Sequence, residues 1–328
     1  MRKGCQALSF RILGTGSALP KRVVTNDDLS GFLDTSDEWI FTRTGIKERR
    51  ICTDETLDDL AMEASRRALD MAGVAAGDLD LIVCSTTTGD HLVPAEACAI
   101  AEGLGANCAA FDVSGACAGF VLALDVADGF MVRGRASRVL VVAAEQMSRI
   151  LDWEDRATCV LFGDGAGAAV ISADEGESPL AMSFSTSPDV ASLNVPGVSG
   201  TCPFKPADHA ASTLSMDGRR VFRFGVGAIC DAVKSLAGQA GVAVSDIDHF
   251  VFHQANERIL SAAVKLLGVD DARVVRTLRS TGNISSACIP LALDSLVRSG
   301  ELERGELVAL VGFGAGLDTG ACLLRWEQ

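Results

Sequence analysis

The chain has 328 residues, carries a net charge of −14 and is 48% hydrophobic, with 33 glycines and no tyrosine. This length can bury the core of one large two-part unit or of two domains. The acidic balance excludes general nucleic-acid binding, which needs a basic surface. We expect no membrane association, because no uninterrupted apolar run is long enough to span a bilayer.

Eleven cysteines are spread along the chain, and no two of them form the C-x-x-C pair typical of metal and redox sites. Most lie in apolar runs such as LIVCSTT and TCVLF, which indicates buried free thiols in a reducing compartment. The opening segment, residues 1–20, is interrupted by Arg11 and several glycines and does not resemble a signal peptide. We therefore expect a cytoplasmic protein without a metal site.

The first half alternates helices and strands. GTGSALP (14–20) lacks the third glycine of a dinucleotide motif and runs into a proline, so it does not predict a nucleotide site. Apolar spacing predicts a helix over 57–71, a buried strand over 81–87 and another strand over 138–144. GDGAGAAVI (163–171) also runs into a strand, which is the wrong context for phosphate binding. No nucleotide redox cofactor is implied.

The second half repeats the first. AGVAAGDLDLIV (72–83) matches AGVAVSDIDHFV (240–251) at seven of twelve positions, 168 residues later, and the surrounding elements follow in the same order. Strands alternating with helices predict an α/β fold with mostly parallel sheets and helices packed on their faces. We divide the chain into an N-terminal half, 1–172, a loop-rich connection, 173–216, and a C-terminal half, 217–328.

Cys117 is the first candidate for chemistry. It lies in DVSGACAGFVLALDV, between a predicted strand and a predicted helix. At a helix start the dipole and the free amides favour a thiolate, so we expect a lowered thiol pKa. The small neighbours leave room for a substrate. The local sequence is equally compatible with a small buried structural thiol.

His253 and Asn283 are the other candidates. His253 ends the strand HFVFHQAN, and the carboxyl ends of strands are where open α/β sheets bind ligands. Asn283 lies in RSTGNISSA, nearly at the place in the second repeat that Cys117 holds in the first. A structural histidine and a turn asparagine remain the alternatives. The duplication favours one shared site, because it brings both strand-to-helix turns to the centre.

At these residues the sequence resembles the β-ketoacyl-acyl-carrier-protein synthase III family, condensing enzymes of the thiolase fold. The resemblance runs almost end to end. It includes TSDEWIFTRTGIKERR, DVSGACAGF, FGDGAGAAV, MDGRRVFRF, HQANERI, TGNISSA and GFGAG. It implies a layered α-β-α-β-α core built from the two halves, and a homodimer.

The resemblance implies that the enzyme initiates fatty-acid synthesis. An acyl-CoA, acetyl-CoA or another short primer, acylates Cys117. A decarboxylative Claisen condensation with malonyl-acyl carrier protein (ACP) then gives 3-oxoacyl-ACP, CoA and CO₂. His253 and Asn283 would donate hydrogen bonds to the malonyl thioester oxygen, and the amides of Cys117 and Ala315 would form the oxyanion hole. CoA is a substrate here, and no cofactor is implied.

The same mapping implies three binding regions. The residues expected to bind CoA are Thr35, Trp39, Arg43, Arg156, Phe222 and Asn256. Those expected to dock the acidic ACP are Arg219, Arg220, Arg223, Arg258 and Lys265. The acyl pocket is expected to involve Leu92, Val93 and Phe313, with Leu92 or Val93 reaching the pocket of the partner subunit.

Three other functions remain as alternatives. A related priming ketosynthase or acyltransferase of a polyketide or other specialised pathway would use the same three residues. A cysteine hydrolase can also use cysteine, histidine and asparagine, but the duplicated α/β pattern does not favour it. A non-catalytic acyl-CoA-binding protein would form no covalent acyl-cysteine.

Overall fold

The computed structural model describes residues 9–174, 178–197, 204 and 213–328. The first eight residues of the expected N-terminal half and parts of the expected connection 173–216 lie outside them. Within the described residues, no helix is both long and apolar enough to cross a membrane.

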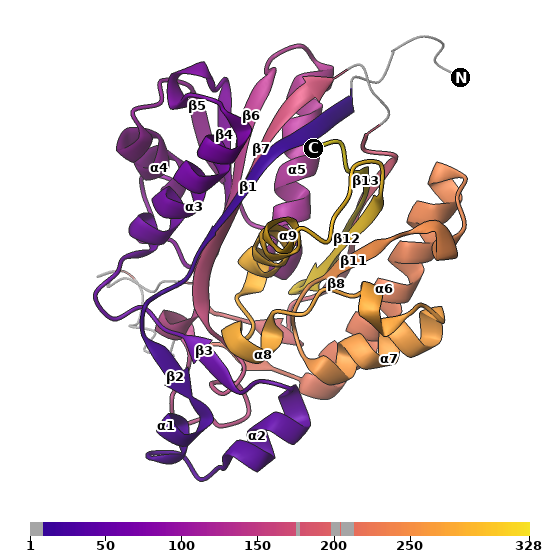
Figure 1. Ribbon diagram of the computed structural model, residues 1–328. Helices are drawn as coiled ribbons and strands as arrows, with labels where there is room; N and C mark the ends of the chain where they lie inside the picture. Colours follow the sequence, from indigo (N-terminus) through magenta and orange to yellow (C-terminus); the bar gives the residue numbers. More distant parts are fainter. Residues whose placement is uncertain (1–8, 175–177, 198–203, 205–212) are drawn as a thin grey trace.

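The first sheet has five strands in the order β1-β7-β6-β4-β5 (Figure 1). β4 runs parallel to β5 and to β6, whereas β7 is antiparallel to β1 and to β6. The bounds of the strands are β1 (Ser9–Ala18), β4 (Leu81–Ser85), β5 (Ala109–Val113), β6 (Arg138–Gln146) and β7 (Asp164–Asp174).

The second sheet has four strands in the order β11-β12-β13-β8. Only β11 and β12 pair in parallel. The bounds are β8 (Ala181–Asp189), β11 (His249–Phe252), β12 (Leu307–Gly314) and β13 (Gly316–Arg325).

Both sheets contain antiparallel pairs, so the expectation of mostly parallel sheets is wrong. β6 leads to β7, and β12 leads to β13, without a full crossover helix, so these strands pair antiparallel.

The two sheets are related strand by strand. The strand β8 corresponds to β1, and β13 corresponds to β7. In the same way, β12 corresponds to β6 and β11 to β4. In place of β5, the second half has an isolated parallel bridge between Phe250 and Val274. The segment 173–216 is thus more than a connection, because it contains β8. This strand is hard to predict because it lies at a sheet edge, where exposed polar residues and Pro188 are tolerated.

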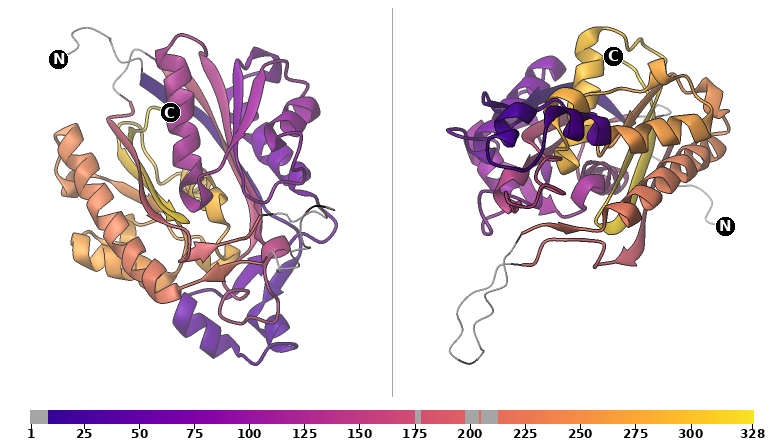
Figure 2. Two further views of the ribbon diagram at one scale, coloured as in Figure 1. Left: turned by 180° about the vertical axis from the view of Figure 1, so that it is seen from behind. Right: turned by 90° about the horizontal axis from the view of Figure 1, so that it is seen from below.

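Helices form three layers around the two sheets (Figures 1 and 2). α3 and α4 cover the outer face of the first sheet, α5 and α9 lie between the sheets, and α6 and α7 cover the outer face of the second. The bounds are α3 (Leu57–Ala72), α4 (Glu96–Leu104), α5 (Gly119–Val132), α6 (Gly218–Ala240), α7 (Glu257–Leu267) and α9 (Cys288–Ser299). The layered α-β-α-β-α fold is confirmed.

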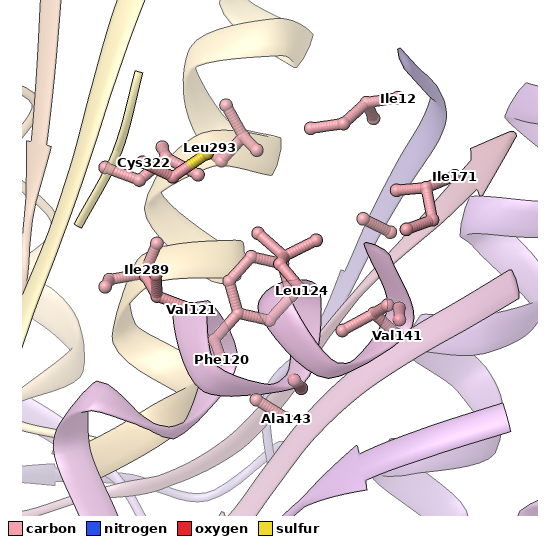
Figure 3. Close-up of a cluster of buried hydrophobic side chains, with 14 of the residues drawn as sticks. Ile12, Phe120, Val121, Leu124, Val141, Ala143, Ile171, Ile289, Leu293 and Cys322 are labelled. Carbon is pink, nitrogen blue, oxygen red and sulfur yellow. The ribbon is translucent and has the colours of Figure 1, made fainter. Parts of the chain in front are cut away.

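The central layer forms the main core of the molecule. α5 is apolar on most of its surface, as a helix buried between two sheets must be. Figure 3 shows its side chains meeting those of α9 and of strands from both sheets. The labelled core residues are Ile12, Phe120, Val121, Leu124, Val141, Ala143, Ile171, Ile289, Leu293 and Cys322. Because both halves contribute to this core, neither half can bury its inner face alone.

The glycines of GTGSALP have a packing role. They lie in β1 where α3 crosses it, and a Cβ on Gly16 would lie 2.2 Å from the backbone oxygen of Ala64. A Cβ on Gly14 would lie 2.5 Å from the oxygen of Ala68. Glycine is needed here so that the helix can approach the strand closely.

Shorter elements form a cap at the end of the molecule near α2 (Figure 1). Its apolar residues, including Leu29, Ile40 and Phe162, form a separate cluster. The remaining elements are β2 (Val23–Thr25), α1 (Asn26–Ser30), α2 (Asp37–Thr44), β3 (Glu48–Arg50), β9 (Leu193–Asn194), β10 (Ser215–Met216) and α8 (Leu278–Thr281).

Candidate active site

Cys117 lies in a short 3₁₀ turn, Ala116–Ala118, between β5 and α5. Ala116 has φ +42°, a left-handed angle that is uncommon for alanine and marks a sharp turn. The thiol is 7% exposed. The end of β12 lies against it: a Cβ on Gly314 would be 2.8 Å from the Cβ of Cys117 and 3.2 Å from its sulfur. Any side chain at position 314 would therefore displace the thiol.

Burial raises the pKa of the Cys117 thiol to about 12. The hydroxyl of Ser285 acts in the opposite direction and lowers it. The expectation of a lowered pKa is wrong, because a helix start contributes only about 0.3–1 kcal/mol. That is less than one pKa unit, and desolvation of the thiolate outweighs it. The thiol is protonated at neutral pH.

Ser285 contacts Cys117, the candidate nucleophile, and was not predicted from the sequence. Its Oγ lies 3.4 Å from Sγ of Cys117, and both side chains are buried. Ser285 has φ +47° and begins the second half's 3₁₀ turn, Ser285–Ala287. The repeat gives a partial signal, because the matching turn Ser285–Ala287 places Ser285 at the position of Ala116, directly before the position of Cys117.

Replacing Ser285 with alanine should slow the acylation of Cys117 about tenfold at neutral pH. The lost hydrogen bond stabilises the thiolate, and one pKa unit corresponds to 1.36 kcal/mol. The thiol pKa should rise, so that the pH profile of acylation moves to higher pH. Rapid-quench acylation across a pH series measures both effects. S286A is the matched control, because the Ser286 hydroxyl bonds Glu145 at 2.8 Å. Equal profiles for S285A and the unmodified protein would contradict this role.

Asn283 is held in place by hydrogen bonds of its backbone and of its side-chain oxygen, Oδ1. Its backbone pairs with the chain leading into β7, through Leu161 and Gly163. Its Oδ1 accepts a hydrogen bond from the Ser285 amide at 2.8 Å. Oδ1 also lies 3.7 Å from the sulfur of Cys288, a buried thiol that the sequence did not single out. Because the oxygen is occupied, the NH₂ group of Asn283 is left as the donor.

His253 follows the end of β11. Its amide donates to the oxygen of Val311 in β12 at 2.8 Å, and its ring meets Phe313 edge-on, with centroids 5.2 Å apart. Burial lowers the pKa of His253 to about 3, so the imidazole is neutral. Its Nδ1 is buried and has no hydrogen-bond partner among the described residues.

The three candidate residues converge through two shared neighbours. The end of β12 touches Cys117 at Gly314 and His253 at Phe313. Ser285 contacts both the sulfur of Cys117 and the amide oxygen of Asn283. The duplication thus brings a thiol, a neutral imidazole and an oriented amide together at the centre of the molecule.

The second half holds a structural counterpart of Cys117. The turns Ala116–Ala118 and Ser285–Ala287 lead into α5 and α9 and place Ser286 where the first half has Cys117. Ser286 donates to the carboxylate of Glu145. Glu145 lies at the position in β6 that Gly314 occupies in β12, and it also accepts hydrogen bonds from Thr87 and Thr88. Its pKa is raised by burial, whereas these hydrogen bonds lower it.

Ala315 lies in the turn between β12 and β13, next to the contact between Gly314 and Cys117. The described non-glycine residues with positive φ are Ala116 and Ser285. Ala315 is therefore accommodated here without a left-handed backbone angle. The amide at this position remains compatible with the expected oxyanion hole.

Most of the residues expected to bind CoA lie together. The guanidinium carbons of Arg43 and Arg156 lie 4.5 Å and 5.2 Å from the centre of the Trp39 ring. Arg156 pairs with the carboxylate of Asp34 at 3.1 Å, not with Asp155. The hydroxyl of Thr35 is buried without a hydrogen-bond partner in the described structure.

Two residues of the expected CoA site have other contacts. The side chain of Asn256 caps α7 and donates to the backbone oxygen of Arg43 at 3.1 Å. This hydrogen bond therefore connects the start of α7 to the end of α2, the helix that carries Trp39. Phe222 packs against the core of the second half.

The expected ACP-docking residues lie on two adjacent helices, α6 and α7, and all of them are exposed. Arg220 pairs with Asp189 at 2.5 Å. Leu266 follows Lys265 on α7 and is 66% exposed, so an apolar side chain accompanies the basic ones.

The three residues expected at the acyl pocket are separated. Phe313 is buried beside His253, where a Cβ on Gly225 would lie 2.5 Å from its ring. Leu92 and Val93 are 84% and 85% exposed on the loop before α4. They do not line a pocket of their own chain.

Comparisons with known proteins agree over nearly the whole chain. The family described as 3-oxoacyl-[acyl-carrier-protein (ACP)] synthase III matches residues 111–188, and its C-terminal part matches residues 237–326. Proteins named β-ketoacyl-[acyl-carrier-protein] synthase III are similar. The one from Xanthomonas campestris pv. campestris is 47% identical, over 96% of this chain and 98% of that protein. The one from Clostridium acetobutylicum is 44% identical, over 98% and 99%.

Solved structures of similar fold belong to the same kind of enzyme. The 3-oxoacyl-[acyl-carrier-protein] synthase III of Aquifex aeolicus has a TM-score of 0.91 and 40% identity, covering 97% of this chain and 100% of that chain. The priming β-ketosynthase of the R1128 polyketide pathway has a TM-score of 0.91 and 41% identity, covering 98% and 97%. The chain therefore belongs to the β-ketoacyl-acyl-carrier-protein synthase III family of condensing enzymes.

Proposed function

We propose that the protein condenses an acyl-CoA primer with malonyl-ACP, the first condensation of fatty-acid synthesis. The observation that carries this proposal is the convergence of Cys117, Asn283 and His253 in a chain of this family. The thiol is the nucleophile, and the amide and the imidazole are donors. No cofactor takes part, because CoA enters as the thioester substrate. We also infer a cytoplasmic location, to which nine described free cysteines are suited.

In the first half-reaction, the Cys117 sulfur attacks the primer carbonyl and expels CoA. A carbon–sulfur bond forms to Cys117, the bond to the CoA sulfur breaks, and the thiol proton ends on CoA. The amides of Cys117 and Ala315 would hold the carbonyl oxygen as it becomes negative. Trp39, Arg43 and Arg156 are the groups we assign to the CoA nucleotide, by stacking and by charge.

In the second half-reaction, malonyl-ACP loses CO₂ and leaves an enolate. Asn283 has its NH₂ group free to donate to the enolate oxygen, because its carbonyl oxygen is bonded to Ser285. His253 is neutral, so it donates an N–H without adding a charge. The enolate carbon then attacks the acyl carbonyl, and the bond to Cys117 breaks to release 3-oxoacyl-ACP. The exposed basic residues of α6 and α7 would receive the acidic ACP.

The test is to incubate the protein with a panel of acyl-CoAs, weigh the intact acyl-enzyme, and then add malonyl-ACP. We expect one acyl group per chain, followed by release of CO₂ and 3-oxoacyl-ACP. Acylation without CO₂ release would instead favour an acyltransferase. No covalent acylation at all would favour a non-catalytic acyl-CoA-binding protein.

A priming ketosynthase of a specialised pathway is the second candidate. The R1128 priming enzyme is as similar to this chain as the Aquifex enzyme is, by both identity and TM-score. The two functions share the same chemistry and differ in the carrier protein. Competition between the fatty-acid ACP and a polyketide ACP for one acyl-enzyme distinguishes them.

We further propose a homodimer that continues the first sheet through β5. This strand ends the sheet in a single chain, and most of its residues are only half-buried. An obligate interface of this kind buries on the order of 2,000–5,000 Å². It would also cover Leu92 and Val93, which are exposed apolar side chains in one chain. A fully active monomer in analytical ultracentrifugation would contradict the dimer.

A bulky substitution at Val93 should change the choice of primer. V93F would fill part of the partner's acyl pocket, so acylation by butyryl-CoA should fall at least tenfold relative to acetyl-CoA. One or two methylene groups in an apolar pocket correspond to roughly this discrimination. L266F is the control, since Leu266 is an exposed apolar residue on α7. An unchanged ratio in V93F would place Val93 outside the pocket.

A further inference from the structure

Three carboxylates meet beside the loop that carries Leu92 and Val93. Asp58 comes from the first turn of α3, Asp90 from the loop, and Glu96 from the first turn of α4. One oxygen from each lies within 4.8 Å of one oxygen from each of the others. These residues are scattered in the sequence, so no motif predicted the cluster, and it takes no part in the proposed reaction.

Two carboxylate oxygens of this cluster lack donors. Glu96 is 0% exposed, and its Oε1 has no hydrogen-bond partner among the described residues, although its Oε2 accepts from the Asp90 amide at 3.0 Å. Oδ1 of Asp58 is also buried without a partner. A buried carboxylate oxygen without a donor carries a large desolvation penalty. Burial, followed by a side-chain hydrogen bond with Asp58 that requires a proton on one of the two carboxyl groups, raises the pKa of Glu96 to about 8.

The surroundings do not balance the negative charge. Arg149 pairs with Asp90 at 2.5 Å and is the arginine that contacts the cluster among the described residues. Asp112 adds a further carboxylate, which accepts hydrogen bonds from the amides of Glu96 and Ala97. The imidazole of His91 lies 3.5 Å from Asp58 and is charged only when protonated. The starts of α3 and α4 offset part of the excess, at about 0.3–1 kcal/mol per helix end.

We propose that Asp58, Asp90 and Glu96 form a binding site for a hard divalent cation, Ca²⁺ or Mg²⁺. Both ions prefer carboxylate oxygens and complete their coordination with water. The oxygens of Glu96 and Asp58 that lack donors are the ligands available to it. A cation at this site would contradict the expectation of no metal site. That expectation was based only on the spacing of the cysteines. The cation would fasten the loop 86–94 to the first turns of α3 and α4.

Calorimetric titration of the EDTA-dialysed protein with CaCl₂ and with MgCl₂ tests the site. We expect one cation per chain with at least one of the two salts, and a Tm higher by a few degrees at saturation. E96Q keeps the shape of Glu96 and removes its charge, so the affinity should fall by at least about tenfold. D58N is the second variant if E96Q does not fold, and its affinity for the cation should fall by a similar factor. E102Q is the matched control, because Glu102 is exposed on the same helix.

Two outcomes would overturn the proposal. One is the absence of binding with either salt. The other is binding that E96Q and D58N leave unchanged, which would place the cation elsewhere. If E96Q raises the Tm in the absence of any cation and no salt binds, the cluster instead holds a proton shared between Glu96 and Asp58. None of these outcomes depends on the condensation reaction, so they are separate from the test of the proposed function.

Discussion

Replacing Cys117 with alanine should abolish the covalent acyl-enzyme and lower condensation by on the order of 10⁴–10⁶-fold, the scale seen when a catalytic nucleophile is removed. The thiol lies at the meeting point of both halves and is the nucleophile of the proposed reaction, and Oγ of Ser285 lies 3.4 Å from its sulfur. Alanine fits the site, since it removes only the sulfur next to Gly314. Intact-mass measurement after acyl-CoA treatment, with peptide mapping, gives the result.

C288A is the informative companion to this variant. Cys288 is also a buried thiol, and its sulfur lies 3.7 Å from the amide oxygen of Asn283. Its pKa is raised by burial and by other contacts that include Cys117, and its sulfur accepts a hydrogen bond from the Ile284 amide at 3.1 Å. C288A should therefore still form the acyl-enzyme. An acyl group that persists in C117A, or that maps to Cys288, would refute Cys117 as the nucleophile.

Alanine at His253 or at Asn283 should separate the two half-reactions. Malonyl decarboxylation should fall about 10²–10³-fold for each lost donor. Acylation of Cys117 should remain within about tenfold of normal, because a histidine with a pKa near 3 is a poor base for a thiol with a pKa near 12. Release of labelled CO₂ from malonyl-ACP measures one half-reaction, and intact mass measures the other.

The pH dependence adds a second readout to these variants. Neutral His253 persists at every pH above about 3, so decarboxylation should show no histidine titration between pH 5 and 8. Acylation should instead rise with pH, as the small thiolate fraction of Cys117 increases. A bell-shaped decarboxylation profile with a limb near pH 6.5 would contradict the neutral donor. Equal loss of both half-reactions in H253A and N283A would contradict the division of labour.

Repeated local patterns predicted the duplication, whereas the layered α-β-α-β-α arrangement was implied by the family resemblance. Apolar spacing marks α3, and a nearly continuous apolar run marks α5 as a buried helix. Strand direction was not predictable in the same way. The antiparallel returns of β7 and β13 depend on the lack of a crossover helix, and β8 is a polar edge strand whose pairing with β13 is set by tertiary contacts.

The sequence predicted which residues make up the candidate site, but it did not predict their pKa values. Cys117, His253 and Asn283 follow from strand ends and from the repeat. The raised thiol pKa follows from burial by β12 and α9, which come from the far end of the sequence. The role of Ser285 depends on one contact across the two halves. The cluster of Asp58, Asp90 and Glu96 depends on three elements that approach only in the folded chain.

The pairing of Ser286 with Glu145 makes the two equivalent turns chemically different. At Gly314 the backbone of β12 packs directly against Cys117, whereas at the equivalent position of β6 the carboxylate of Glu145 accepts a hydrogen bond from Ser286. The equivalent location is thus a close backbone contact in one half and a hydrogen-bonded brace in the other. Through Thr87 and Thr88, that brace also ties the unreactive turn to the loop after β4. We therefore expect acylation to be confined to the first half, with the equivalent turn of the second half acting as structural support.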